Sequence, residues 1–286
     1  MQLPNPLELF QSLVPELLAQ YPNIKPKLAK TERLLQISPR DLVDIFFEDA
    51  PPNPLTPVYT EEEEEDEDEE NEEEVAENQP KTPAVYSDIY CWLDDLQDAS
   101  RLFNNAIAKA HEDKKELLGE FRDMFNTLYY LAKNSQNFQR KWYNPPATDA
   151  ALQALQSVLP TPLPLTLLVA LRVTNGVKEC VYMNDSDLWF ASAETMLSLY
   201  KRYNEIHQKE KDIQFCLPIF HCNHGAWLLC LQKLEAETDF RGNAIQKGSI
   251  LNYNEDEGSM YGLKYVKRKY LNFVEITEIW YGQEEL

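Results

Sequence analysis

The segment over residues 149–177 constrains the fold more than any other part of the chain. It reads DAALQALQSVLPTPLPLTLLVALRVTNGV. Leu152, Leu155 and Val158 recur at the spacing of one helix face. Prolines at 160, 162 and 164 are predicted to end that helix, because proline has no backbone N–H to donate and clashes with the preceding turn. The order is therefore an amphipathic helix, a leucine-proline break, an apolar segment and an Asn175-Gly176 stop.

The apolar segment over residues 163–176 has two interpretations. It can be a helix that ends at Gly176, because glycine readily adopts the left-handed conformation that closes helices. It can also be a buried strand followed by a turn, because LTLLV is apolar on every side. The sequence leaves both interpretations open.

Short strand patterns and one helix follow this segment. Strands are predicted over 178–183, 187–190, 213–220, 226–232 and from 248, with a turn at 221–225. Ser192 is the predicted N-cap of a helix with Glu194 in its first turn. The inward face of that helix is expected to hold Met196, Leu199, Tyr200, Tyr203 and Ile206. A closing helix is expected over 261–280. Without regular βαβ units, this pattern predicts an α+β domain over 147–286, with a central mixed or antiparallel sheet flanked by helices.

This order, with its LP break and NG stop, resembles the SUKH superfamily over about residues 147–286. That family includes a fungal regulator of cell-wall synthesis and many bacterial toxin-immunity proteins. The resemblance implies a non-enzymatic protein-binding module, either an immunity protein that neutralises a toxin domain or a regulatory scaffold that gathers partners. Many members carry an aspartate in the strand after the central turn. Here that strand reads LLCLQ, with Cys230 and Gln232, so no role that depends on the carboxylate is transferred.

The first half of the chain divides into three stretches. Residues 1–50 are predicted to be a helical segment whose second helix starts at Ser38 and Pro39. Residues 51–83, rich in proline and acids, are a predicted disordered linker. Residues 84–146 are a predicted helical region with two helices, the second of which Gly119 could interrupt. The sequence does not decide whether residues 1–50 pack on residues 84–146.

The charge of the chain favours basic partners. The formal net charge is −21, and residues 61–77 hold 14 of the 48 acids. Without that run, 34 acids against 27 bases still leave −7. Such a protein would repel the phosphate backbone of nucleic acid, whereas a basic protein, such as a toxin domain, would be attracted.

The sequence predicts no catalytic residue, cofactor or metal site, and hence no enzyme. Cys216, His221, Cys222 and His224 have the chemistry of zinc ligands, but their spacing is poor and a hairpin turn with buried cysteines is favoured. With only 8 glycines the chain contains no phosphate-binding glycine motif.

Candidate binding residues are aromatic or charged side chains on the predicted strands and turns. Trp189 and Trp227 could anchor a partner, since aromatic residues dominate interface energetics, although core packing is the alternative for each. The turn residues His221 and His224 are further candidates. The acids Glu255, Asp256 and Glu257 could meet a basic partner, with a solvated turn as the alternative.

The remaining features favour a cytoplasmic protein that does not engage membranes. The five cysteines are odd in number and lie in apolar contexts, which suits reduced thiols. The N-terminus lacks the basic and apolar regions of a signal peptide, and no run approaches a bilayer-spanning length of about 18 apolar residues.

Overall fold

The computed structural model describes residues 2–44, 85–133, 143–178, 181–183, 186–208, 212–222, 225–234 and 244–254. The predicted linker at 51–83 and the predicted closing helix at 261–280 lie outside these ranges. The α-helices in the described ranges are α1 Pro6–Gln20, α2 Lys25–Gln36, α3 Pro39–Asp44, α4 Val85–Ile107, α5 Glu112–Lys133, α6 Asp149–Val158, α7 Leu165–Val173 and α8 Ala193–Ile206. Short 3-10 helices span Pro22–Ile24 and Ile213–Phe215.

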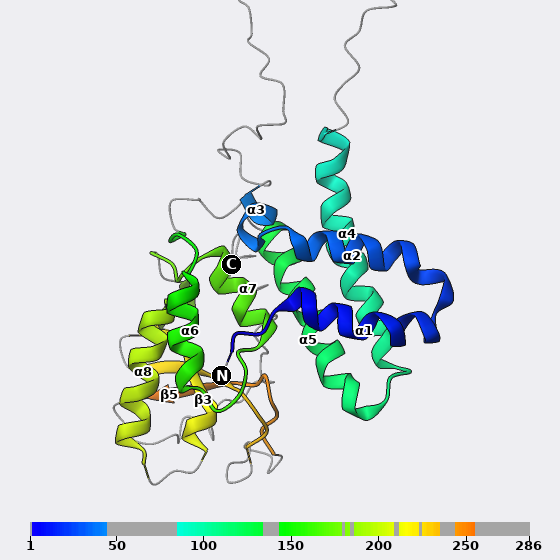
Figure 1. Ribbon diagram of the computed structural model, residues 1–286. Coiled ribbons are helices and arrows are strands. Elements are labelled where there is room, and N and C mark those ends of the chain that lie inside the picture. The colour runs from blue at the N-terminus through cyan, green and yellow to red at the C-terminus, as the bar shows by residue number, and fades with distance from the viewer. Residues whose placement is uncertain are drawn as a thin grey trace, which may run out of the picture.

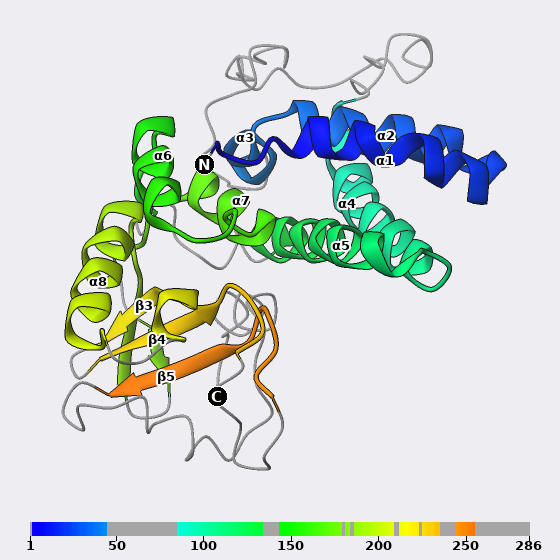
Figure 2. The same cartoon turned by 60° about the horizontal axis from the view of Figure 1, so that its bottom comes forward.

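The strands form an antiparallel sheet in the order β1-β2-β3-β4-β5. Figure 2 shows its last three strands, β3, β4 and β5, side by side. The first part of β2 pairs with β1, and its last two residues, Trp189 and Phe190, pair with β3. The bounds are β1 Val181–Met183, β2 Ser186–Phe190, β3 Cys216–Cys222, β4 Gly225–Cys230 and β5 Ile250–Asn254. The predicted α+β class with an antiparallel sheet is confirmed. The predicted turn at 221–225 is shorter than expected, because β3 extends to residue 222 and β4 starts at residue 225.

The ambiguous apolar segment is the helix α7, and the strand interpretation is wrong. Eight of its nine residues are buried, which is what a helix that is apolar all round requires. It lies between α6 and α5 (Figure 1), and α3 and α5 both pack on it. A strand of the same composition would leave these neighbouring helix faces without an apolar partner.

A buried glutamine holds the leucine-proline break that precedes α7. The Gln156 side chain is fully buried. Its Oε1 accepts a hydrogen bond from the Leu163 backbone N–H at 2.8 Å, and its Nε2 donates to the Thr161 carbonyl at 3.0 Å. These two bonds satisfy backbone groups that the prolines leave outside any helix or sheet.

The Asn-Gly stop after α7 connects that helix to α8. Gly176 has φ 79°, and a Cβ there would lie 2.8 Å from the Ser192 nitrogen and 2.9 Å from the Phe190 oxygen. The Asn175 Oδ1 accepts from the Ala193 N–H at 2.8 Å, and its Nδ2 donates to Glu194 at 2.9 Å. That second bond lowers the pKa of Glu194. Asn175 therefore helps to cap α8, together with the predicted N-cap Ser192.

The N-terminal helices pack on α4 and α5. The Phe10 ring lies 6.2 Å from the rings of both Phe103 and Phe121, and Phe103 stacks on Phe121 at 5.0 Å and Phe125 at 5.8 Å. Beyond these rings, α3 joins α7, because the Arg40 guanidinium donates to the Val173 carbonyl at 2.9 Å. One buried hydrophobic cluster therefore runs from α1 through α4, α5 and α7 to the sheet.

The alternation along β4 sends its side chains into two cores. Trp227 and Leu229 belong to the large cluster with α7, whereas Leu228 and Cys230 belong to a smaller cluster with Tyr203 of α8. Both faces of the sheet are thus covered, as a strand that is buried at every position requires.

Two details differ from the sequence-based expectations. Ile206, expected on the inward face of α8, is 57% exposed because it is the last helical residue. Gly119 does not interrupt α5, which runs unbroken through it. A Cβ at Gly119 would meet no atom within 4 Å, so no neighbouring group requires a glycine at this position of the helix.

Candidate functional site

One row of side chains crosses the sheet on the face opposite the large core. Trp189 lies opposite His221, His221 opposite Ala226, and Ala226 opposite Tyr253. Because directly opposed residues of antiparallel strands share a face, these four side chains lie on the same side of the sheet.

The outer end of this row is a stacked aromatic pair. The Trp189 and His221 rings are nearly parallel, with an interplanar angle of 13° and centroids 5.4 Å apart. Both residues are partly exposed. We call this pair the aromatic stack. Its two residues, chosen as separate candidates from the sequence, are brought into contact by the pairing of β2 with β3.

The aromatic stack carries no charge at pH 7, because the imidazole of His221 is neutral there. Burial lowers the pKa of His221 below its ordinary value, so the imidazole is neutral at pH 7. A neutral imidazole on an indole presents a flat apolar surface with ring N–H groups at its edge, the kind of surface that anchors protein interfaces.

The inner end of the row is buried against α8. The Tyr253 and Tyr203 ring centroids are 4.6 Å apart, and the Tyr253 hydroxyl lies 2.8 Å from His207 Nε2. His207 and both tyrosines are buried. These contacts hold the sheet against α8 at the end of the row opposite the aromatic stack.

Of the other sequence candidates, only Trp227 is within the described residues. Trp227 is on the opposite face of β4, only 9% exposed in the large core, which fits its core-packing alternative. The structure therefore separates Trp227 from the aromatic stack. His224 and the acids Glu255, Asp256 and Glu257 lie outside the described residues.

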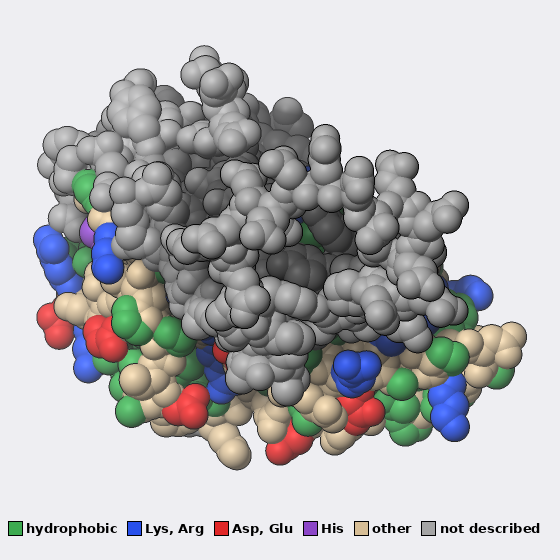
Figure 3. All heavy atoms as spheres, turned by 90° about the horizontal axis from the view of Figure 1, so that it is seen from above, with side chains coloured by type: hydrophobic (Ala, Val, Ile, Leu, Met, Phe, Trp, Pro, Cys, Tyr) green, Lys and Arg blue, Asp and Glu red, His purple; other side chains and the backbone are tan. Residues whose placement is uncertain are grey.

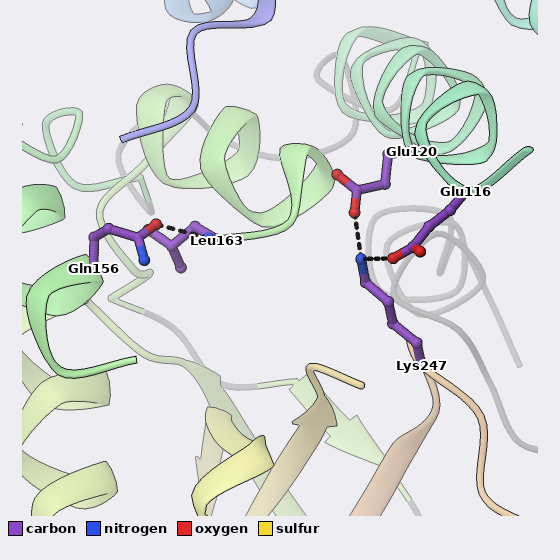
Figure 4. A network of polar contacts seen from close by, with 5 residues as sticks. All are labelled: Glu116, Glu120, Gln156, Leu163 and Lys247. Carbon is purple, nitrogen blue, oxygen red and sulfur yellow. Dashed lines mark hydrogen bonds and ion pairs between the residues drawn. The ribbon is translucent and has the colours of Figure 1, made fainter. Parts of the chain in front are cut away.

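A second polar arrangement, which sequence reasoning missed, connects the sheet to α5. Lys247, in the connection before β5, lies 2.5 Å from carboxylate oxygens of both Glu116 and Glu120 (Figure 4). The spacing of the two acids on one helix face was visible in the sequence. Their lysine partner, more than a hundred residues away in the chain, carried no such signal. A cavity of about 220 Å³ adjoins the three side chains and has Gly119 and Thr166 in its wall.

The environment of Lys247 raises its pKa above the ordinary value. Burial acts to lower the pKa, but the two nearby carboxylates outweigh it. The ion pairs of Lys247 therefore stabilise the fold fully below the unfolded pKa of lysine, about 10.4. This stabilisation disappears as pH rises through the higher pKa of the folded state.

We expect Lys247→Ala to lower the free energy of unfolding by about 1 kcal/mol near neutral pH. The difference from the wild type, measured by urea unfolding, should shrink above about pH 10.5. A difference that grows at high pH would contradict this assignment.

A larger cavity of about 430 Å³ lies where α1, α3, α5 and α7 meet. Its wall is mainly apolar but includes Arg40 and Arg172. The Arg40 guanidinium lies 5.7 Å from the centre of the Tyr143 ring, and Arg172 forms an ion pair with Asp149 at 3.2 Å. The two basic groups are thus already engaged with the protein itself.

Charges of both signs are interspersed on the face of the molecule that Figure 3 shows. In Figure 3, basic and acidic side chains alternate along the rim, and neither sign forms a large patch there. Among the described residues, no group of three or more His, Cys, Asp or Glu side chains is arranged to hold a metal ion. Within the same ranges, no helix is both long and apolar enough to cross a bilayer.

No family model matches the chain, and the search of curated proteins found no match.

Proposed function

We propose that this protein is a non-enzymatic protein-binding module of the SUKH type, and that it acts as an immunity protein that binds and neutralises a basic toxin domain. The observation that carries the proposal is the partly exposed aromatic stack of Trp189 and His221 on a sheet that is buried against α8 at the other end of the row. Interface energy concentrates in such aromatic anchors, and an anchor held by buried neighbours loses little entropy on binding.

The order of elements supports the SUKH part of the proposal. Between residues 149 and 254 the chain has a helix, a leucine-proline break, an apolar helix ending at Asn175-Gly176, two strands, the helix α8, and three strands of which the first contains Pro218. The contacts of Gln156 and Gly176 supply a structural reason for the break and for the stop.

The excess of acids supports a basic partner. Electrostatic attraction would speed the encounter, and the aromatic stack would then limit dissociation. We expect association to slow as salt rises from about 50 to about 500 mM, because the Debye length falls from above 10 Å to a few ångströms. Deletion of residues 61–77 should slow association and leave dissociation nearly unchanged. Association that is indifferent to salt would contradict the electrostatic part of the proposal.

Trp189→Ala is expected to weaken binding to a basic toxin domain by at least about tenfold, which corresponds to a loss of roughly 1.4 kcal/mol or more. Affinity can be measured by biolayer interferometry with the full-length protein. Tyr130→Ala is the matched control, because Tyr129 and Tyr130 form another partly exposed aromatic pair, with centroids 5.4 Å apart, on α5. Equal losses for the two variants, or no loss for Trp189→Ala, would refute the role of the aromatic stack.

A regulatory scaffold is the second candidate function. The cavity where α1, α3, α5 and α7 meet favours it, because this cavity would offer a partner surface on elements far from the aromatic stack. A pull-down with the full-length protein separates the two functions. Capture of one basic toxin domain supports immunity, whereas capture of several signalling proteins supports the scaffold.

A further inference from the structure

Two cysteines of the small core face each other across adjacent strands. Cys216, the first residue of β3, lies directly opposite Cys230, the last residue of β4. Just outside this pair, the Leu231 N–H donates to the Phe215 carbonyl at 2.8 Å. A bond between the flanking residues means that the two cysteines occupy a non-hydrogen-bonded position of the antiparallel ladder.

Such a position matches the geometry of a disulfide. Directly opposed residues at non-hydrogen-bonded positions have Cα atoms about 4.5 Å apart and side chains on the same face. A disulfide joins Cα atoms that are about 4.4–6.8 Å apart, so the backbone already has the spacing that the bond needs. Cys222, at the other end of β3, lies opposite Gly225 and has no cysteine facing it across the ladder.

The surroundings keep the pair reduced at rest. Cys216 and Cys230 are 1% and 0% exposed. The Cys216 thiol donates to the Asp212 carbonyl at 3.5 Å. Burial, followed by the hydrogen bond with Cys216, raises the pKa of the Cys230 thiol well above its ordinary value. Because the thiolate is the reactive form, oxidation requires a small oxidant and a local opening of the strand ends.

We propose that Cys216 and Cys230 are a site of reversible oxidation, where hydrogen peroxide converts the two thiols into a cross-strand disulfide. One thiolate attacks a peroxide oxygen, and the O–O bond breaks to give a sulfenic acid and, after protonation, one water. The second thiol then attacks that sulfur, the S–S bond forms, and a second water leaves. Two thiol hydrogens and two electrons pass to the peroxide, and a dithiol reductant reverses the change.

The position of the two cysteines explains how peroxide can reach them and what their disulfide would do to the sheet. The two cysteines close one end of the β3–β4 ladder, and strand ends open more readily than strand centres. A bond at this place would prevent that end from opening while leaving the opposite end, where His221 contacts Trp189, free to bind. The inference does not depend on the proposed partner.

The test is peptide mapping of the folded, full-length protein after treatment with hydrogen peroxide. Remaining thiols are alkylated in denaturant, and the products are identified by mass spectrometry. Trypsin leaves Cys216, Cys222 and Cys230 in one fragment, residues 212–233, so chymotrypsin, which cuts after Phe220 and Trp227, is needed to separate them.

We expect the fragment with Cys216 to be linked to the fragment with Cys230 and Cys222 to be alkylated. Treatment with dithiothreitol before alkylation should restore the Cys216 and Cys230 thiols. Cys222→Ser is the matched control from the same strand and should keep the link. The proposal is overturned if Cys216 and Cys230 are both fully alkylated after peroxide treatment of the wild type. A link that includes Cys222, or one that forms only in unfolded protein, would overturn it as well.

Discussion

Gly176→Ala is expected to lower the free energy of unfolding by about 3 kcal/mol or more. Two costs combine at this residue. Its φ of 79° is unfavourable for any residue with a Cβ, and the added Cβ would lie within 3 Å of the Ser192 nitrogen and the Phe190 oxygen. Both are backbone atoms at the junction of β2 and α8, so relief of the clash would disturb the cap that Asn175 makes on Ala193.

Two other glycines provide controls for the same substitution. Gly248→Ala meets the conformational cost alone, because its φ is 82° but no atom lies within 4 Å of the added Cβ. We expect that variant to lose about 1 kcal/mol. Gly119→Ala should instead gain about 0.5–1 kcal/mol, because the site is helical and open. Urea unfolding followed by circular dichroism gives the three values. Equal stability of Gly176→Ala and Gly248→Ala would show that the contact of the added Cβ at residue 176 with the neighbouring backbone does not lower the free energy of unfolding.

Phe103→Ala is expected to destabilise the protein by about 3–5 kcal/mol, the usual cost of removing a buried phenylalanine ring. Phe103 is fully buried and lies within 6.2 Å of the rings of Phe10, Phe121 and Phe125. Its removal would leave a cavity between α1 and the α4–α5 pair, so the N-terminal helices should also become more sensitive to protease. Thermal unfolding and limited proteolysis measure the two effects.

Ile206→Ala is the control for Phe103→Ala. It also removes a large hydrophobic side chain, but Ile206 is 57% exposed, so the change should stay within about 0.5 kcal/mol. If both variants lost the same stability, the docking of α1 on Phe103 would not contribute to the fold. If Phe103→Ala left the N-terminal helices as resistant to protease as the wild type, their attachment would depend on other contacts.

The local signals in the sequence determined the positions of most elements. Ser192 caps α8 and Ser38 caps α3, because a hydroxyl that accepts a backbone N–H is a local property of the chain. The prolines after α6 and the glycine after α7 mark real boundaries for the same reason, since proline and glycine act on the backbone at their own positions. The pairing of β3 with β4 followed from two apolar runs with a short polar turn between them.

Only the tertiary structure decided what these elements contact. The segment LTLLV is equally apolar as helix or strand, and its burial against α3 and α5 settles it as the helix α7. The aromatic stack of Trp189 and His221, the two carboxylates around Lys247 and the docking of Phe10 on Phe103 each join residues far apart in the chain. Capping, helix breaking and periodicity are short-range effects that a sequence displays directly. Contacts between distant residues depend on the packing of whole elements, and no local pattern in one segment encodes its partner.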